Sequence, residues 1–404
     1  MCDEREAVLR LLRADGIGHG RVRMLRLALG GAAGALQASP SEFAAAIGVA
    51  ESEGARMLCE ARCAEVAGSV AAELAFLSRA GARAVVEGVD DYPALLEVMP
   101  DPPPILFLRG ELAGEPEAAV AIVGSRRASA YGRLQAGRIA AELAERGVTV
   151  VSGGARGIDA EAHRGALRAG GRTIAVLATG LANPYPSEHV PLFDAIVEAG
   201  GALVTEQCAE VTARPDLFPR RNRIIAGLAL VTVVVEAAAR SGALLTARLA
   251  VDDLSRSAGC VPGQIDSVTS EGCHRAIREG WAQLVTGAAD ICELVEEMRS
   301  TACGARERRG AAVGRAGAVF RRHGPAPRSG SCPQSRSESP DPPDIGQDAA
   351  LVLRAVRSAG RAGLDELERA LEWTVPRIAL ATLELERAGL AVRDPEGAYR
   401  STSA

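Results

Sequence analysis

Residues 150–163 read Val150-Val-Ser-Gly-Gly-Ala-Arg-Gly-Ile-Asp-Ala-Glu-Ala-His163. A short apolar run passes directly into a glycine-rich loop, and a stretch with helical spacing follows. The same alternation recurs along the chain, with apolar runs at 119–123, 148–151, 173–177, 202–205, 230–235 and 258–261. Strands that are apolar throughout and alternate with helices indicate a parallel sheet covered on both faces. We therefore predict an α/β fold, an extended Rossmann-like doubly wound parallel sheet.

The regions on either side of this pattern differ from it in composition. Residues 1–70 have the spacing of short helices and predict a small all-α N-terminal domain, with the α/β domain covering 71–300. Residues 299–338 hold nine arginines against two glutamates, so 301–345 are interpreted as a flexible basic linker. Residues 346–404 predict three short helices and a strand pair, which is the layout of a winged helix.

A glycine-rich segment lies near the start of the chain, Gly16-Ile-Gly-His-Gly20. It resembles the hairpin of a SAM-like helix-hairpin-helix domain, whose backbone N–H groups can contact a phosphate. The alternative is a glycine turn between two core helices. For a single hairpin we favour the turn.

Charge and cysteine content restrict the possible functions. The formal net charge is -5 and all 46 basic residues are arginine, so a general nucleic-acid binder is disfavoured while a local basic groove stays possible. The nine cysteines form no CxxC pair, which indicates reduced thiols and neither a metal site nor a disulfide framework. The longest apolar run, residues 228–235, is far shorter than the roughly 20 residues of a membrane span. With no secretory pattern at the start, we expect a cytoplasmic protein.

Unusual residues gather where the predicted strands end. In an open α/β sheet, ligands bind at the carboxyl ends of the strands. Glycines before a helix N-terminus let backbone N–H groups approach phosphate oxygens, and nearby guanidinium groups add charge-assisted bonds. This edge is therefore predicted to bind phosphate, although the glycines alone would also suit a structural role. The candidates are Gly124, Ser125, Arg126, Ser152, Gly153, Gly154, Arg156, Gly157, Ser241 and Gly242.

The loop after residue 152 lacks the signature of a nucleotide cofactor site. Its glycines are spaced Gly-Gly-x-x-Gly, and no acidic residue is placed to hold a ribose. A Walker motif needs a lysine, and the sequence has none. We therefore expect no cofactor and no nucleoside triphosphate hydrolysis.

Three acidic or basic side chains could instead serve catalysis. Asp159 and His163 are one helical turn apart, and Glu236 follows a predicted strand. An Asp in the first turn of a helix commonly complements the helix dipole, and a His one turn later is often its structural partner. We favour structural and pocket-forming roles for all three and predict no catalytic residue.

Several long motifs, in fixed order, resemble the DprA/Smf family of DNA-processing proteins. They include the 150–163 stretch, Ala121-Ile-Val-Gly-Ser-Arg-Arg127, Tyr185-Pro186, Phe218-Pro-Arg-Arg-Asn-Arg-Ile-Ile225 and Ser241-Gly-Ala-Leu-Leu-Thr-Ala247. The resemblance implies a non-enzymatic protein that binds single-stranded DNA during natural transformation, protects it and loads the RecA recombinase. It also implies a homodimer formed through the Rossmann domain. Carried over by motif, the DNA site would include the glycine-loop candidates and the basic segment Arg221, Asn222 and Arg223.

Some positions depart from the family pattern. Ser187-Glu188-His189 stands where many relatives have a nearby basic residue, and Gly272-Cys-His274 replaces a Gly-x-Asn segment. We therefore expect weaker DNA binding than in typical relatives. Because aromatic residues make up only 3% of the chain, phosphate contacts should dominate, with strong salt dependence. The predicted recognition helix, 376–388, has no net charge, which favours a protein-contact or autoregulatory role for the winged helix.

A second function class also uses glycine-rich loops on such a sheet. A Rossmann-like enzyme acting on nucleoside phosphates would bind its substrate at the same edge. That interpretation lacks a convincing acid–base constellation and leaves the flanking domains unexplained, so we rank it below DNA binding.

Overall fold

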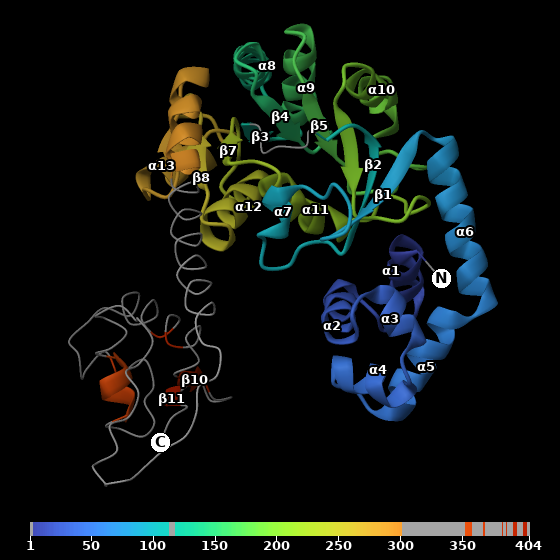
Figure 1. Ribbon diagram of the computed structural model, residues 1–404. Coiled ribbons are helices and arrows are strands. Elements are labelled where there is room, and N and C mark those ends of the chain that lie inside the picture. Colours follow the sequence, from blue (N-terminus) through green and yellow to red (C-terminus); the bar gives the residue numbers. More distant parts are fainter. Residues whose placement is uncertain are drawn as a thin grey trace, which may run out of the picture. The chain divides into compact units, whose positions relative to one another are not determined.

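The computed structural model describes residues 3–112 and 118–300, together with 352–357, 367, 382, 385, 391–393 and 399–401 (Figure 1). The chain divides into two compact units, Met1–Arg321 and Arg322–Ala404.

Six helices open the first unit. They are α1 (Glu4–Arg13), α2 (His19–Leu29), α3 (Ala32–Gln37), α4 (Pro40–Ile47), α5 (Glu51–Arg62) and α6 (Ala64–Arg79). Phe43 of α4 belongs to the same apolar core as Phe107, which lies on a strand of the sheet. The helices therefore pack on one edge of the sheet, and the predicted boundary at residue 70 falls inside α6.

The glycine segment near the start joins α1 to α2. Gly16 has φ 86°, and a Cβ there would lie 2.7 Å from Cε of Met57. Arg21 Nη1 donates to the Gly16 carbonyl at 2.8 Å. These contacts favour the interpretation of this segment as a turn between packed helices.

A nine-stranded sheet forms the centre of the first unit, in the order β1-β2-β6-β5-β4-β3-β7-β8-β9. The strands β6, β5, β4, β3, β7, β8 and β9 run parallel to one another. At the other edge of the sheet, β2 is antiparallel both to β6 and to β1. The predicted mostly parallel α/β sheet is therefore confirmed. The strands are β1 (Ala82–Val86), β2 (Ile105–Gly110), β3 (Ala119–Val123), β4 (Thr149–Ser152), β5 (Thr173–Val176), β6 (Ala202–Thr205), β7 (Val231–Val234), β8 (Ser257–Cys260) and β9 (Gln283–Leu284).

Helices cover both faces of this sheet (Figure 1). Because side chains alternate along a strand, Val120 and Ile122 of β3 join one apolar core while Ala121 and Val123 join the other. The first core takes in α8 and α9, and the second takes in α11 and α12. The labelled helices after β1 are α7 (Ala94–Glu97), α8 (Ala130–Glu145), α9 (Ile158–Arg168), α10 (Val190–Glu198), α11 (Leu217–Gly227), α12 (Gly242–Arg248) and α13 (Glu271–Arg278), and residues 288–300 are also helical.

In the second unit, β10 (Ala391–Arg393) pairs antiparallel with β11 (Tyr399–Ser401), and residues 352–357 are helical. The predicted linker, 301–345, and most of the predicted recognition helix, 376–388, lie outside the described residues. The winged helix therefore stays a prediction. Within the part of the chain that is described, no helix is both long and apolar enough to cross a membrane.

Candidate functional site

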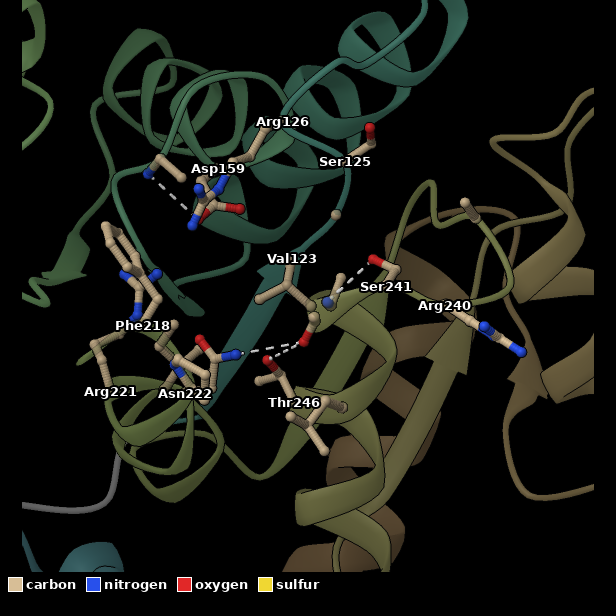
Figure 2. Close-up of a pocket in the computed structure, with 18 of the residues that line it drawn as sticks. Val123, Ser125, Arg126, Asp159, Phe218, Arg221, Asn222, Arg240, Ser241 and Thr246 are labelled. Carbon is tan, nitrogen blue, oxygen red and sulfur yellow. Dashed lines mark hydrogen bonds between the residues drawn. The ribbon is translucent and has the colours of Figure 1, made fainter. Parts of the chain in front are cut away.

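A cleft of about 590 Å³ lies beyond the carboxyl ends of β3 and β7 (Figure 2). From β3 the chain continues to β4 on one side of the sheet, whereas its other neighbour, β7, follows much later in the sequence. Such a reversal of strand order leaves a crevice at the strand ends, which is where open α/β sheets bind ligands. The loops after β3 and β4 form one wall of the cleft, and α11 and the start of α12 form the others.

Two of the predicted glycines hold the first two loops against each other. A Cβ on Gly124 would lie 2.6 Å from Ile158 Cγ1, and one on Gly157 would lie 2.3 Å from the Ser125 carbonyl oxygen. Gly157 also has φ 80°, a conformation that favours glycine. The Ile158 N–H donates to Ser125 O at 3.2 Å. Glycine is therefore needed here for close packing of the two loops, whatever ligand they meet.

Ser152, Gly153 and Gly154 lie below the surface of the cleft. All three are buried, and Ser152 Oγ donates to the Ile122 carbonyl at 2.6 Å. The Gly154 carbonyl is 2.9 Å from Nδ1 of His189. In this structure these residues shape the loop and do not face the open cleft.

Arg221 is also buried, although it lines the floor of the cleft. Its Nη1 donates to the carbonyls of Gly153 and Val176, the latter at 2.6 Å. Burial lowers the pKa of Arg221 to about 10, an effect partly opposed by the nearby Asp159 carboxylate. Asp159 is buried too, and loss of hydration raises its pKa. Arg221 thus fastens α11 to the ends of β4 and β5.

The other two residues of the predicted basic segment face different ways. Asn222 lines the cleft and its Nδ2 donates to the Gly242 carbonyl at 3.4 Å. Arg223 forms an ion pair with the buried Glu206 and donates to the Asp101 carbonyl at 2.7 Å. The structure therefore places Arg223 outside the cleft.

Ser241 and Gly242 form the opposite wall, at the start of α12. Ser241 Oγ accepts the Ala243 N–H at 3.2 Å and caps the helix, and Gly242 is exposed. Arg240 precedes them, exposed, and in Figure 2 it extends from the α12 side of the cleft, across from Arg126. Among the described residues, neither Arg240 nor Arg126 forms an ion pair, although the charge of Arg126 acts on the Asp159 carboxylate.

Arginine and aromatic side chains are combined at the rim. The Arg126 guanidinium lies 4.6 Å from the centroid of the Phe218 ring. Phe218 packs edge-on against Tyr185, with ring centroids 5.9 Å apart. Arg156 lies 5.8 Å from the Tyr185 ring and forms an ion pair with Glu188. Tyr185 is 39% exposed, so this row of side chains is open to a ligand.

The three candidate catalytic groups occupy structural positions. His163 is fully buried with Nδ1 2.7 Å from Thr173 Oγ1, and no hydrogen bond joins it to Asp159 among the described contacts. The buried Glu236 accepts from the Ser129 N–H at 2.9 Å and from its hydroxyl at 2.5 Å, at the start of α8. Glu236 thereby orders the loop that carries Arg126. In the described part of the chain, no group of His, Cys, Asp and Glu side chains could hold a metal ion.

Phe218, Tyr185 and Arg240 were not among the site residues predicted from the sequence. Each stands inside or beside a motif quoted above, but aromatic content over the whole chain is too low to single them out. Position in the sequence could have identified the aromatic residues, because an aromatic residue beside a conspicuous motif at a strand end is a candidate for stacking on a ligand.

The fold and the cleft together define the class of this protein: an open α/β-sheet protein with an arginine-lined ligand cleft at the point where the strand order reverses. The chain belongs to the DprA/Smf family, because the family model described as DNA recombination-mediator protein A matches residues 83–296.

Named relatives agree with this assignment. Protein Smf of Escherichia coli is 42% identical over 228 residues, which are 56% of this chain and 60% of that protein. DNA processing protein DprA of Streptococcus pneumoniae is 41% identical over 202 residues, 50% of this chain and 70% of that protein. Its X-ray structure superposes with a TM-score of 0.54 at 30% identity, covering 71% of this chain and 97% of the other. The match thus spans less than two thirds of the E. coli relative's length.

Proposed function

We propose that this chain is a recombination mediator that binds single-stranded DNA in the cleft beyond β3 and β7. The observation that carries the proposal is Arg126: exposed, without an ion pair among the described residues, and stacked on Phe218 at the cleft rim, with the Asp159 carboxylate near enough to interact with its charge. A guanidinium in this position can bind a backbone phosphate while the neighbouring ring offers a face to a base.

The geometry supports a single strand as the ligand. Arg126 and Arg240 line opposite walls of the cleft, so both walls carry a positive residue, although in Figure 2 the Arg240 guanidinium points away from Arg126. Bases of a single strand are free to turn toward Phe218 and Tyr185, whereas those of a duplex are already paired and stacked. Asp159, a carboxylate on the cleft wall, is buried, and loss of hydration raises its pKa.

The proposal includes the wider role implied by the family. The bound strand would be protected and passed to the RecA recombinase, and the chain would form a homodimer through its α/β domain. The role is non-enzymatic, which is supported by the structural engagement of His163 and Glu236. A nucleoside-phosphate enzyme is the alternative, and no specific contact in the cleft favours it.

The proposal is tested by fluorescence anisotropy of a labelled oligo(dT), titrated at about 50 and 200 mM salt with duplex DNA as competitor. We expect binding that weakens with salt and resists the duplex. Arg126→Ala should weaken it about tenfold or more, because one charge-assisted phosphate contact and the stack on Phe218 are lost. The control is Arg146→Ala, which removes an exposed arginine near the amino ends of β3 and β4, away from the cleft. No binding at the lower salt, or equal loss in both variants, would overturn the proposal.

The contact of the Phe218 ring with DNA is tested by variants that change the shape of the side chain and leave its charge unchanged. Phe218→Leu keeps an apolar side chain but removes the ring, and we expect weaker binding by about 1 kcal/mol or more. Phe218→Trp restores a flat face and should bind at least as tightly as the parent. Equal affinity of the Leu and Trp variants would show that the ring does not contact DNA.

A further inference from the structure

A second, shallower cleft of about 390 Å³ lies beside the first. The two share four lining residues at the start of α12: Arg240, Ser241, Gly242 and Leu245. They are therefore neighbouring parts of one surface. A chain molecule that fills the first cleft can continue into the second over Arg240.

An indole and a guanidinium are stacked in this second cleft. Arg248, near the end of α12, lies 4.1 Å from the centroid of the Trp281 ring, which comes from the segment between α13 and β9. The Arg248 side chain is 41% exposed. Its outer face is thus open to a ligand while its inner face rests on the indole. Nucleic-acid bases stack on both aromatic rings and guanidinium planes.

The charge of this cleft is positive. Arg240, Arg248 and Arg275 line it, with Glu279 as the carboxylate among its lining residues. Glu279 is shared: its oxygens lie 3.6 Å from Arg248, 3.7 Å from Arg275 and 3.1 Å from the Trp281 indole nitrogen. One carboxylate cannot neutralise three guanidinium groups. Asp252 adds a long contact to Arg248, at 3.7 Å, but is not part of the lining.

We infer that a single strand of DNA held in the first cleft continues across Arg240 and stacks a base on the Arg248–Trp281 pair. This inference rests on the proposed function and extends it by a second contact site on the same strand. It follows from three features that occur together: the shared wall, the excess of guanidinium groups and the exposed stack. An apolar peptide would leave these arginines without partners, whereas each nucleotide brings a phosphate to meet them.

The chain itself provides a probe. It has two tryptophans, Trp281 and Trp373, so Trp373→Phe leaves Trp281 as the indole fluorophore in the full-length protein. We expect Trp281 emission to be quenched when an oligo(dT) of about 12 nucleotides or more is added, and much less by one of about 4, which fills a single small site. Quenching that is equal for both lengths would contradict a continued path.

Affinity gives an independent readout. Trp281→Ala and Arg248→Ala should each lower the ratio of affinities for the long and short oligonucleotides about five- to tenfold. Arg248→Ala removes an exposed group, so it stays informative if Trp281→Ala fails to fold. The matched control is Arg278→Ala, an exposed arginine on α13 that does not line this cleft.

The outcomes separate this inference from the proposed function. If oligo(dT) binds in an Arg126-dependent way but the length ratio and Trp281 emission are unchanged, the second site is wrong and the first stands. If oligo(dT) does not bind at all, the proposed function itself fails. If the ratio falls equally in Arg278→Ala, the effect is general charge and the stack is not a site.

Discussion

Glu188 forms an ion pair with Arg156 at the rim of the cleft, with the Arg156 Nε 2.5 Å from a Glu188 carboxylate oxygen. Both side chains are about half exposed, and the hydrogen bond from Arg156 lowers the pKa of Glu188. Glu188 belongs to the segment Ser187-Glu188-His189, near which the resemblance to the family leads us to expect a basic residue. In the structure, the Glu188 carboxylate pairs with the Arg156 guanidinium, which comes from the glycine-rich loop and would otherwise be available to a phosphate.

This pair predicts that Glu188→Gln strengthens binding of single-stranded DNA. An exposed ion pair contributes little to stability, so the dissociation constant should fall only up to about fivefold once Arg156 is released. The salt dependence should become steeper, because one more guanidinium can contact phosphate. Anisotropy titrations over a range of salt measure both quantities.

A matched control is Glu296→Gln, which breaks the exposed Glu296–Arg299 pair outside the cleft. It removes the same charge and should leave affinity nearly unchanged. If the two variants behave alike, net charge explains the effect. Unchanged affinity and salt slope in Glu188→Gln would mean that Arg156 does not contact DNA.

Alanine variants of two neighbouring arginines on α11, Arg220 and Arg221, should differ in their free energy of unfolding. Arg221→Ala leaves the carbonyls of Gly153 and Val176 without their donor and the buried Asp159 without its positive neighbour. We expect the free energy of unfolding to fall by about 3 kcal/mol, measured by urea denaturation. Arg220→Ala removes an exposed arginine and should cost less than about 0.5 kcal/mol. Full stability in Arg221→Ala, with DNA binding lost, would show that Arg221 contacts DNA directly.

The buried His163 predicts a pH dependence of stability. Burial, assisted by the charges of His189 and Arg221, lowers the pKa of His163 from 6.5 to about 3. Between these pH values the unfolded chain binds a proton that the folded chain excludes, so stability falls as the pH drops below 6.5. The loss from this group should be about 2 kcal/mol on going from pH 6.5 to 5.

Comparison with His163→Gln isolates this contribution. The raised pKa of Asp159 acts in the opposite direction, because the folded state then takes up a proton more readily as the pH falls. Glutamine keeps a donor for Thr173 Oγ1 but does not titrate, so its stability should vary less with pH over this range. Parallel urea midpoints for both proteins from pH 7 to 5 would exclude His163 as the cause.

The strands of the sheet were predictable to different degrees. The six apolar runs correspond to β3–β8, because a strand buried on both faces needs apolar residues at every position. The antiparallel pair β1 and β2 extends the sheet beyond that pattern, and its burial depends on α1–α6 packing over it. β9 has only two residues and carries no periodic signal.

The basic segment on α11 shows that residues of one sequence motif need not face the same site. Arg221, Asn222 and Arg223 are consecutive, and successive residues of a helix point about 100° apart. They cannot all face one ligand. The structure turns Arg221 into the sheet and Arg223 toward Glu206, and it leaves Asn222 on the cleft wall.

The sequence by itself determined the strand–loop–helix alternation, the family and the edge of the sheet where the site lies. These are local properties, since apolar runs and glycines such as Gly157 constrain the backbone where they stand. Only the tertiary structure decided which arginines are available to a ligand. Arg156 and Arg223 are paired with Glu188 and Glu206, which lie on other segments, whereas Arg126 stacks on an aromatic ring and forms no ion pair among the described residues. Charge pairing depends on distances between segments far apart in sequence, and those distances exist only in the folded chain.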